Sequence, residues 1–330
     1  MALSAEAETV FKVTFAALIL LNVGGNSLVC LVVRRFQRMR TPMNYLLVNL
    51  AISDIVVGIF FLPRHLLLGV FTYPDDGLAA DWLCKLITYA NLAWLASFAS
   101  VYTLVIIAWE RYNAIMKPLS VSARFTTKKI KICVAFTWII AFLVTLAEVI
   151  ATEYNKETAF CDYNWKEAWN KADAAFWLFG VGVLPTVIMC SLYGRVIKSL
   201  WCSRQAVTPH DVSYRSLLKS RKRVTKAALT VTSILFACWM PNLIYYFMTT
   251  FTPKSSSTGS ALTNVSPIWY RLSHVLILLN SSVNPLVYAV QDRRFRAGMK
   301  SYLCRCKRRA QENSMQQDDT IFRLSVINGR

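Results

Sequence analysis

Seven long apolar runs are the feature that most constrains this chain. Each has about 20 residues, the length a helix needs to cross the hydrocarbon core of a bilayer. Lipid offers the backbone no water partner, so each run must be a helix or part of a closed barrel, and continuous runs fit helices. We therefore predict an all-α membrane protein, a bundle of seven transmembrane helices. The predicted spans are residues 10–33, 44–68, 83–108, 132–151, 174–197, 227–251 and 268–290.

Loop charge predicts the orientation of the bundle. The first, third and fifth connections are rich in Lys and Arg, whereas the alternate connections carry Asp and Glu. Because basic loops stay inside, these three connections and the C-terminus face the cytoplasm, and the N-terminus lies outside. The formal net charge of +19 is explained by this asymmetry beside anionic lipid, so we expect no nucleic acid partner.

Composition divides the chain into four parts. Residues 1–9 form an extracellular N-terminus without the basic start of a cleavable signal peptide, so the first span is expected to be retained. Residues 10–290 form the transmembrane domain. In residues 291–302 an apolar stripe faces a basic surface, which predicts a short amphipathic eighth helix. Residues 303–330 lack apolar periodicity and predict a flexible cytoplasmic tail.

Five residues suggest covalent modification. Cys84 and Cys161 both fall on the oxidising outer side. A disulfide between them would pin the long loop after the fourth span across the bundle mouth, and would contribute about 2–4 kcal/mol. Cys304 and Cys306 follow a basic cytoplasmic segment and are predicted palmitoylation sites. Asn264 begins a glycosylation sequon on an outer loop.

Asp54 stands in the middle of the second apolar run. A carboxylate at the centre of a membrane helix costs about 2.5–3.5 kcal/mol on insertion scales, so it normally faces a polar interior and marks a functional site. We therefore expect polar partners for Asp54 from neighbouring helices.

Three short motifs occur in order at the ends or kinks of particular spans. Glu110-Arg111-Tyr112 closes the third span, Trp239-Met240-Pro241 interrupts the sixth, and Asn284-Pro285-Leu286-Val287-Tyr288 closes the seventh. With these motifs the chain resembles the rhodopsin-like (class A) G-protein-coupled receptors over all seven spans and the following short helix. The resemblance implies a plasma-membrane receptor that binds an extracellular agonist and promotes GDP release from Gα. It also implies heterotrimeric G proteins, arrestin, receptor kinases and membrane lipids as partners.

The resemblance assigns roles to the motif residues. Arg111 would be held by Glu110 at rest and would become available to the G protein when the sixth helix swings outward, with Tyr193 and Tyr288 stabilising the open state. The full switch set is Glu110, Arg111, Tyr112, Tyr193 and Tyr288. The activation set is Trp239, Pro241, Pro185, Phe236, Asn284 and Pro285. Each Pro removes an intrahelical hydrogen bond and predicts a kink, although membrane helices also tolerate Pro without a hinge.

The polar partners that the resemblance gives to Asp54 are Asn26, Ser100, Asn280 and Ser281. Oxygen ligands of this kind can hold an allosteric sodium ion, and we expect no other cofactor. The alternative is a hydrogen-bonded, water-filled network without an ion. Either arrangement would satisfy the buried carboxylate.

The chain departs from the family pattern in three places. The inner end of the sixth helix reads Arg-Lys-Arg at 221–223, so no carboxylate there can latch Arg111, and we expect agonist-free signalling. Cys84 lies about two residues further from Arg111 than is usual, which requires either a local bulge in the third helix or a disulfide one turn further out. In the sixth helix Leu235 occupies the usual Phe position, so either Leu235 or Phe236 packs in the connector with Pro185 and Val101.

Two positions narrow the ligand class, because each lacks a residue that a known class of receptor needs to bind its ligand. Ala93 replaces the Asp of amine receptors, and Leu278 replaces the Lys that binds retinal. Similarity to neuropeptide receptors favours a peptide, and a lipid or another small molecule is the alternative. Candidate pocket residues are Arg64, His65, Glu148, Tyr245 or Tyr246, Arg271 and His274, although ionisable residues at helix ends are often snorkelling surface groups.

Two other classes of protein are disfavoured. A channel or transporter needs a continuous polar lining or repeat symmetry, whereas Leu50 and Leu104 are expected below Asp54. An enzyme needs a metal site or an activated nucleophile. The three His residues show no metal-ligand spacing, and no nucleophile has a paired base, so we expect no enzymatic activity.

Overall fold

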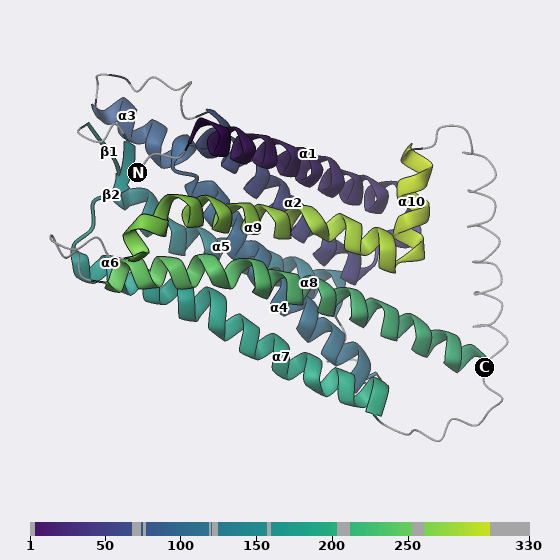
Figure 1. Ribbon diagram of the computed structural model, residues 1–330. Coiled ribbons are helices and arrows are strands. Elements are labelled where there is room, and N and C mark those ends of the chain that lie inside the picture. Colours follow the sequence, from purple (N-terminus) through teal and green to yellow (C-terminus); the bar gives the residue numbers. More distant parts are fainter. Residues whose placement is uncertain are drawn as a thin grey trace.

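The computed structural model confirms the predicted helical bundle. It describes residues 4–67, 74, 77–118, 120, 125–156, 160–202, 212–252 and 261–303, without the side chains of 160, 162, 201, 202, 212–220, 261–267 and 303. Among the described residues, seven helical segments are long and apolar enough to cross a membrane. They lie side by side in one elongated bundle, with a short eighth helix at one end (Figure 1).

The helices extend beyond most of the apolar runs. The long ones are α1 (Ala5–Arg35), α2 (Pro42–Leu62), α4 (Asn91–Met116), α5 (Thr127–Ala151), α7 (Leu184–Ile197), α8 (Val212–Phe251) and α9 (Ala261–Gln291). The short ones are α3 (Gly77–Leu83), α6 (Glu167–Ala175) and α10 (Arg293–Leu303). Helix α8 begins well before residue 227, where its apolar run begins, because a helix satisfies its own backbone in the polar interface as it does in lipid.

Side-chain caps fix several helix starts. The Ser4, Thr41 and Thr126 hydroxyls accept hydrogen bonds from backbone N–H groups three residues on, at 3.2–3.3 Å. Such caps satisfy N–H groups that have no partner inside the helix. Pro42 follows Thr41 in the first turn, where its missing N–H costs nothing. These signals explain why α1, α2 and α5 begin before their apolar runs.

A β-hairpin that the sequence analysis did not predict lies at one end of the bundle. Strands β1 (Thr152–Asn155) and β2 (Phe160–Tyr163) pair antiparallel, with Tyr154 opposite Cys161. Asp81 Oδ1 accepts a 2.7 Å hydrogen bond from Tyr154 N and ties the hairpin to α3. We call this the hairpin end, and α1 starts there too (Figure 1). The opposite end, where α10 lies, is the α10 end.

The third span contains the local bulge that was one of the two predicted alternatives. Helix α3 passes into a π-helical turn at Cys84–Thr88, and α4 begins anew at Asn91. Between them Ala90 adopts a left-handed conformation with φ 69°, which is uncommon for a residue with a Cβ. The extra residues between Cys84 and Arg111 are absorbed here, so the disulfide forms without displacing Arg111.

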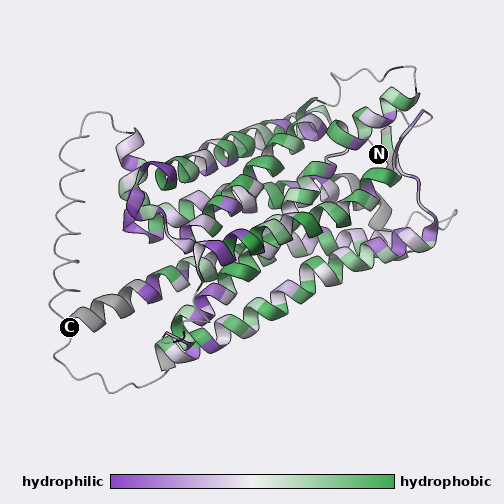
Figure 2. Cartoon of the chain, turned by 180° about the vertical axis from the view of Figure 1, so that it is seen from behind, coloured by the Kyte–Doolittle hydropathy of each residue, from purple (hydrophilic) through white to green (hydrophobic). Residues whose placement is uncertain are grey.

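Apolar side chains fill the centre of the bundle. Phe61, Leu50 and Leu104, on α2 and α4, are among the largest side chains that are fully buried. Figure 2 shows hydrophobic residues along the helices and hydrophilic ones gathered on α10 and in the loops. Two residues of the predicted stripe on α10, Phe295 and Met299, join the core. Helix α10 is therefore fixed against the bundle by its apolar face.

Candidate functional site

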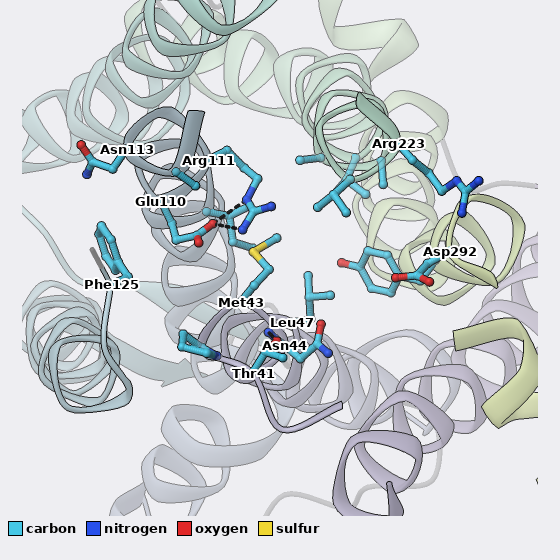
Figure 3. A pocket seen from close by; sticks show the side chains of 18 of the residues that line it. Thr41, Met43, Asn44, Leu47, Glu110, Arg111, Asn113, Phe125, Arg223 and Asp292 are labelled. Carbon is cyan, nitrogen blue, oxygen red and sulfur yellow. Dashed lines mark hydrogen bonds and ion pairs between the residues drawn. The ribbon is translucent and has the colours of Figure 1, made fainter. Parts of the chain in front are cut away.

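A cavity of about 460 Å³ lies at the α10 end, between α2, α4, α8 and α9. Its polar lining includes Glu110 and Arg111 from α4, Arg223 from α8 and Asp292 just after α9 (Figure 3). This volume lies within the range of ligand pockets. The cavity therefore offers a binding site at the end of the bundle that the sequence predicts to be cytoplasmic.

Glu110 and Arg111 are paired in the wall of this cavity. Arg111 Nε donates to Glu110 Oε2 at 2.5 Å, and Arg111 Nη2 forms an ion pair with the same oxygen (Figure 3). The two side chains are only 14% and 11% exposed, so water screens the pair weakly. The geometry is that of an arginine held by its neighbour, as expected for a resting receptor.

The three tyrosines of the predicted switch occupy different places. Tyr288 lines the cavity together with Arg111. Tyr193 is buried on α7 and is not among the lining residues. Tyr112 packs against a small apolar cluster between α4 and α7. The cavity thus brings together three members of the set, Glu110, Arg111 and Tyr288, and the other two tyrosines lie toward α7.

The wall contributed by α8 is basic. Arg223 lines the cavity, and the sequence of α8 contains no Asp or Glu at all. A neutral contact ties α8 to α9 instead, because Gln291 Nε2 donates to Thr230 Oγ1 at 3.0 Å. Arg111 therefore has no carboxylate on α8 to hold it.

Asp54 is fully buried and is bound by side chains from two other helices. Asn284 Nδ2 donates to its Oδ2 at 2.7 Å, and Ser100 Oγ donates to its Oδ1 at 3.4 Å. Asn26 does not bond Asp54 directly. Its amide donates to the backbone oxygen of Ser281 at 3.0 Å and so joins α1 to α9.

Three amide oxygens of this cluster lack a partner. Among the described residues, the Oδ1 atoms of Asn26, Asn280 and Asn284 are buried without a hydrogen-bond donor. Buried polar atoms are normally satisfied by protein, water or an ion. The cluster therefore has acceptor capacity beyond what the side chains use.

The connector between the two ends is built from α4, α7 and α8. Trp239 is buried, with its ring centroid 6.5 Å from that of Trp94, and Pro241 follows inside α8. Pro185 is buried in the first turn of α7.

The prediction that Phe236 belongs to this connector is wrong. Phe236 is 47% exposed on the outside of the bundle, whereas Leu235 is 4% exposed and joins the core with Val101. Successive residues of a helix point about 100° apart, so only one of the two can face inward.

A smaller pocket of about 120 Å³ lies at the hairpin end. Arg64, from the π-helical turn that ends the second span, lines one part of it. Its Nε donates to the Tyr270 hydroxyl at 2.8 Å, and its Nη1 donates to the Tyr89 carbonyl at 3.1 Å. His274 lies beside Tyr270. Its Nδ1 donates a 2.7 Å hydrogen bond to the backbone oxygen of Tyr270. This part of the pocket carries positive charge.

The part lined by the fourth, fifth and sixth spans carries two carboxyl groups. Trp177 Nε1 donates to Glu148 Oε1 at 2.6 Å, and the Tyr246 hydroxyl donates to Asp173 Oδ2 at 2.8 Å. Tyr163 of β2 lines the same pocket. Burial raises the pKa of the Tyr163 hydroxyl well above its ordinary value, so this group is a neutral donor at physiological pH.

The pocket residues predicted from the sequence divide into two groups. Arg64, Glu148, Tyr245 and His274 line the pocket, together with Tyr246, whereas His65 and Arg271 are not among its lining residues. The His65 ring stacks on Phe15 of α1, with centroids 4.0 Å apart. Each of these two residues directly follows a lining residue, and one helical step rotates a side chain away from the pocket.

The sequence analysis missed Tyr270, Trp177 and Asp173. Tyr270 precedes His274 by four residues, which places both on one helix face and could have identified it. Asp173 lies just before residue 174, where the fifth span is predicted to begin, but the structure extends this span outward to Glu167. Trp177 carried no signal in the sequence beyond its aromatic character.

The predicted disulfide between Cys84 and Cys161 is confirmed. It fastens β2 to the start of the bulged segment, and Asn91 strengthens this attachment. Asn91 Nδ2 donates to Lys85 O and to Thr152 Oγ1, both at 3.0 Å. The hairpin is thereby held where Tyr163 can line the pocket.

Some predicted sites fall outside the described residues. These are Cys304, Cys306 and the rest of the 303–330 tail apart from the backbone of Leu303. The side chain of Asn264 is also outside, although its backbone belongs to α9. Palmitoylation and glycosylation therefore stay predictions from sequence.

Comparison with known proteins places the chain in a family. The sequence profile of the seven-transmembrane receptors of the rhodopsin family matches residues 25–288. The chain belongs to this family. Neuropeptide receptor 22 of Caenorhabditis elegans is 29% identical over 290 residues, which cover 84% of this chain but only 65% of that receptor.

Two further relatives match more of their own length. A QRFP-like peptide receptor of Branchiostoma floridae is 28% identical over 320 residues, covering 93% of this chain and 80% of the relative. The pyroglutamylated RF-amide peptide receptor of Mus musculus is 25% identical over 319 residues, covering 92% and 72%. The similarity thus extends through the whole bundle.

Proposed function

We propose that this chain binds an extracellular peptide in the hairpin-end pocket and activates heterotrimeric G proteins from the α10-end cavity. Activation would consist of promoting GDP release from a bound Gα subunit. The observation that carries the proposal is Arg111, held by Glu110 in the wall of a 460 Å³ cavity. An arginine stored in this way can be released to a partner when the helices around it move.

The hairpin-end pocket favours a peptide over a lipid or another small molecule. Its volume of about 120 Å³ is below the ~300–1,000 Å³ that usually encloses a drug-sized ligand. Arg64, Glu148 and Asp173 give it charges of both signs, which suit a polar end group. A peptide can insert one end here and lay the rest on the hairpin and α3. The relatives named for peptides support the same ligand class.

The orientation follows from charge. The α10 end carries the basic connections, so it lies in the cytoplasm under the positive-inside rule, and the hairpin end lies outside the cell. The plasma membrane is the location where such a receptor meets a secreted peptide. Arrestin and receptor kinases would act at the α10 end as well, because the cavity that exposes Arg111 is there.

Activation would couple the two ends through the interior. Trp94 lines the hairpin-end pocket and lies beside Trp239, two residues before Pro241, which lies inside α8 and predicts a bend there. A ligand that shifts Trp94 would therefore bias the bend of α8. An outward swing of α8 would widen the cavity around Arg111, and a ligand with higher affinity for the open state would favour it.

We further propose that the Asp54 cluster holds a sodium ion. The fit is supported by its donor set, because a carboxylate, a hydroxyl and three unpartnered amide oxygens are the hard oxygen ligands that such a cation takes. Asp54 and Ser100 would bind the ion directly, with Asn26, Asn280 and Ser281 around them. The ion would supply positive charge that stabilises the buried carboxylate.

The receptor function is tested by nucleotide exchange. The purified chain in nanodiscs should accelerate GDP release from at least one Gα class without ligand, and further when neuropeptides are screened against it. Arg111→Ala should remove the acceleration, whereas Arg195→Ala, at an exposed arginine of α7, should keep it. Failure with every Gα class, combined with passage of current or solute, would instead support a channel or transporter.

A further inference from the structure

One oxygen of Glu148 is buried in the hairpin-end pocket without a partner. Glu148 is 1% exposed, and its Oε1 accepts from Trp177. Among the described residues, none donates a hydrogen bond to Oε2, although the Tyr163 hydroxyl lies near this carboxyl group. A buried carboxylate oxygen left unsatisfied is costly, so its presence beside a cavity indicates a missing donor.

A second carboxyl group faces the same space. Asp173 also lines the pocket, and it is close enough to Glu148 for the two like charges to act on each other. Tyr246 donates to Asp173, just as Trp177 donates to Glu148. A hydrogen bond to one oxygen therefore fixes the position of each carboxyl group. Neither has an ion-pair partner within the described part of the chain.

The pocket is polarised. Its basic residue, Arg64, comes from the second span and contacts Tyr270 of α9 and Tyr89, whereas Glu148 and Asp173 come from the fourth and fifth spans. A cationic ligand group is repelled by Arg64 and attracted by the two carboxylates. The pocket can therefore orient a ligand as well as bind it.

We propose that Glu148 and Asp173 together bind a guanidinium group, the side chain of an arginine near the inserted end of the peptide. This inference rests on the proposed function, because it names the ligand group that the hairpin-end pocket takes. A single cation placed between the two carboxylates supplies the donor that Glu148 Oε2 lacks and removes the repulsion between them.

A guanidinium fits this site better than an ammonium. Its five N–H donors lie in one plane, so it can contact carboxylates on two different helices at once. It is also more weakly hydrated and stacks on aromatic faces. Trp177, Tyr246 and Tyr163 supply such faces in the lining. The pocket volume of about 120 Å³ is large enough for a guanidinium group at the end of a side chain.

The test uses defined probes and needs no identified agonist. Nα-acetylarginine amide at millimolar concentration should raise the thermal unfolding temperature of the purified receptor. Nα-acetylcitrulline amide has nearly the same shape without the charge, and it should have little effect. Nα-acetyllysine amide should stabilise the receptor less than the arginine probe. Equal effects of the arginine and citrulline probes, or none from the arginine probe, would overturn the proposal, and equal effects of lysine and arginine would overturn the guanidinium assignment.

Variants locate the effect. Glu148→Gln keeps an acceptor for Trp177 and should weaken apparent affinity for the arginine probe about 10- to 100-fold, the worth of a hydrogen bond to a charged group. Asp173→Asn should weaken it similarly. Glu153→Gln alters an exposed acid of β1 outside the pocket and should bind as the unaltered chain does. Unchanged affinity in both pocket variants would contradict the proposal.

The probe test and the exchange test can fail independently. Thermal stabilisation by the arginine probe reports binding at the hairpin end even if no Gα is activated. Nucleotide exchange without ligand reports the α10 end even if no guanidinium binds.

Discussion

The Asn284 amide donates a 2.7 Å hydrogen bond to the carboxylate of Asp54, across a sequence separation of 230 residues. Asn284 directly precedes Pro285, where α9 lacks an intrahelical hydrogen bond. The buried charge of α2 is thus bound next to this proline, and Asn26 of α1 donates to the Ser281 carbonyl that Pro285 leaves without its helical partner. Any ion or proton that changes the charge of Asp54 therefore also acts on α9 beside Pro285.

The first prediction concerns sodium. The receptor should unfold at a higher temperature in sodium chloride than in N-methylglucamine chloride of equal ionic strength. A stabilisation of about 1 kcal/mol is expected at several times the dissociation constant. Asp54→Asn should abolish the difference, because the amide cannot supply the negative charge. Asp292→Asn changes a carboxylate at the α10 end and should preserve it. Sodium dependence that persists in Asp54→Asn would favour the water-filled network.

The second prediction concerns the Arg111 switch. Glu110→Gln should raise ligand-free nucleotide exchange about two- to tenfold, because a loss of roughly 0.4–1.4 kcal/mol in the resting pair shifts the equilibrium by that factor. The measurement is GDP release from Gα at matched receptor concentration. Exchange that falls in Glu110→Gln would show that the pair supports the active state instead.

The third prediction concerns the carboxylate that α8 lacks. Arg223→Glu places a carboxylate in the cavity wall opposite Arg111, and ligand-free exchange should fall. Lys222→Glu makes the same charge change one residue earlier, at a position outside the cavity lining, and should have a smaller effect. Equal reductions in both variants would point to general loss of positive charge at the G-protein surface.

The fourth prediction compares neighbouring glycines in α1. A Cβ at Gly24 would meet nothing within 4 Å, whereas a Cβ at Gly25 would lie 3.0 Å from the Pro285 ring. Alanine favours helix over glycine by about 1 kcal/mol at both sites. Gly24→Ala should therefore raise the unfolding temperature, and Gly25→Ala should lower it, because the proline ring cannot bend away. A higher unfolding temperature in both would show that the α1–α9 contact is loose.

Sequence alone was sufficient for the helices, whereas their orientation in the membrane stays a prediction from loop charge. Seven apolar runs predicted seven spans because backbone groups in lipid must pair within a helix, which is a local requirement. Loop charge predicted which end is basic, and the motif spacing identified Glu110 and Arg111. The same spacing showed that extra residues lie between Cys84 and Arg111. It allowed two structural alternatives, a local bulge in the third helix or a disulfide one turn further out.

Only the tertiary structure decided which way side chains point and where the bulge forms. Leu235 rather than Phe236 faces the core, and Tyr270 rather than Arg271 lines the pocket, although the neighbours differ by one position. In a run that is apolar on all sides, periodicity does not mark the inner face. Rotation about each helix axis is set by packing against neighbours distant in sequence. For the same reason, the pairing of Glu148 with Asp173 around one pocket became visible only in the folded bundle.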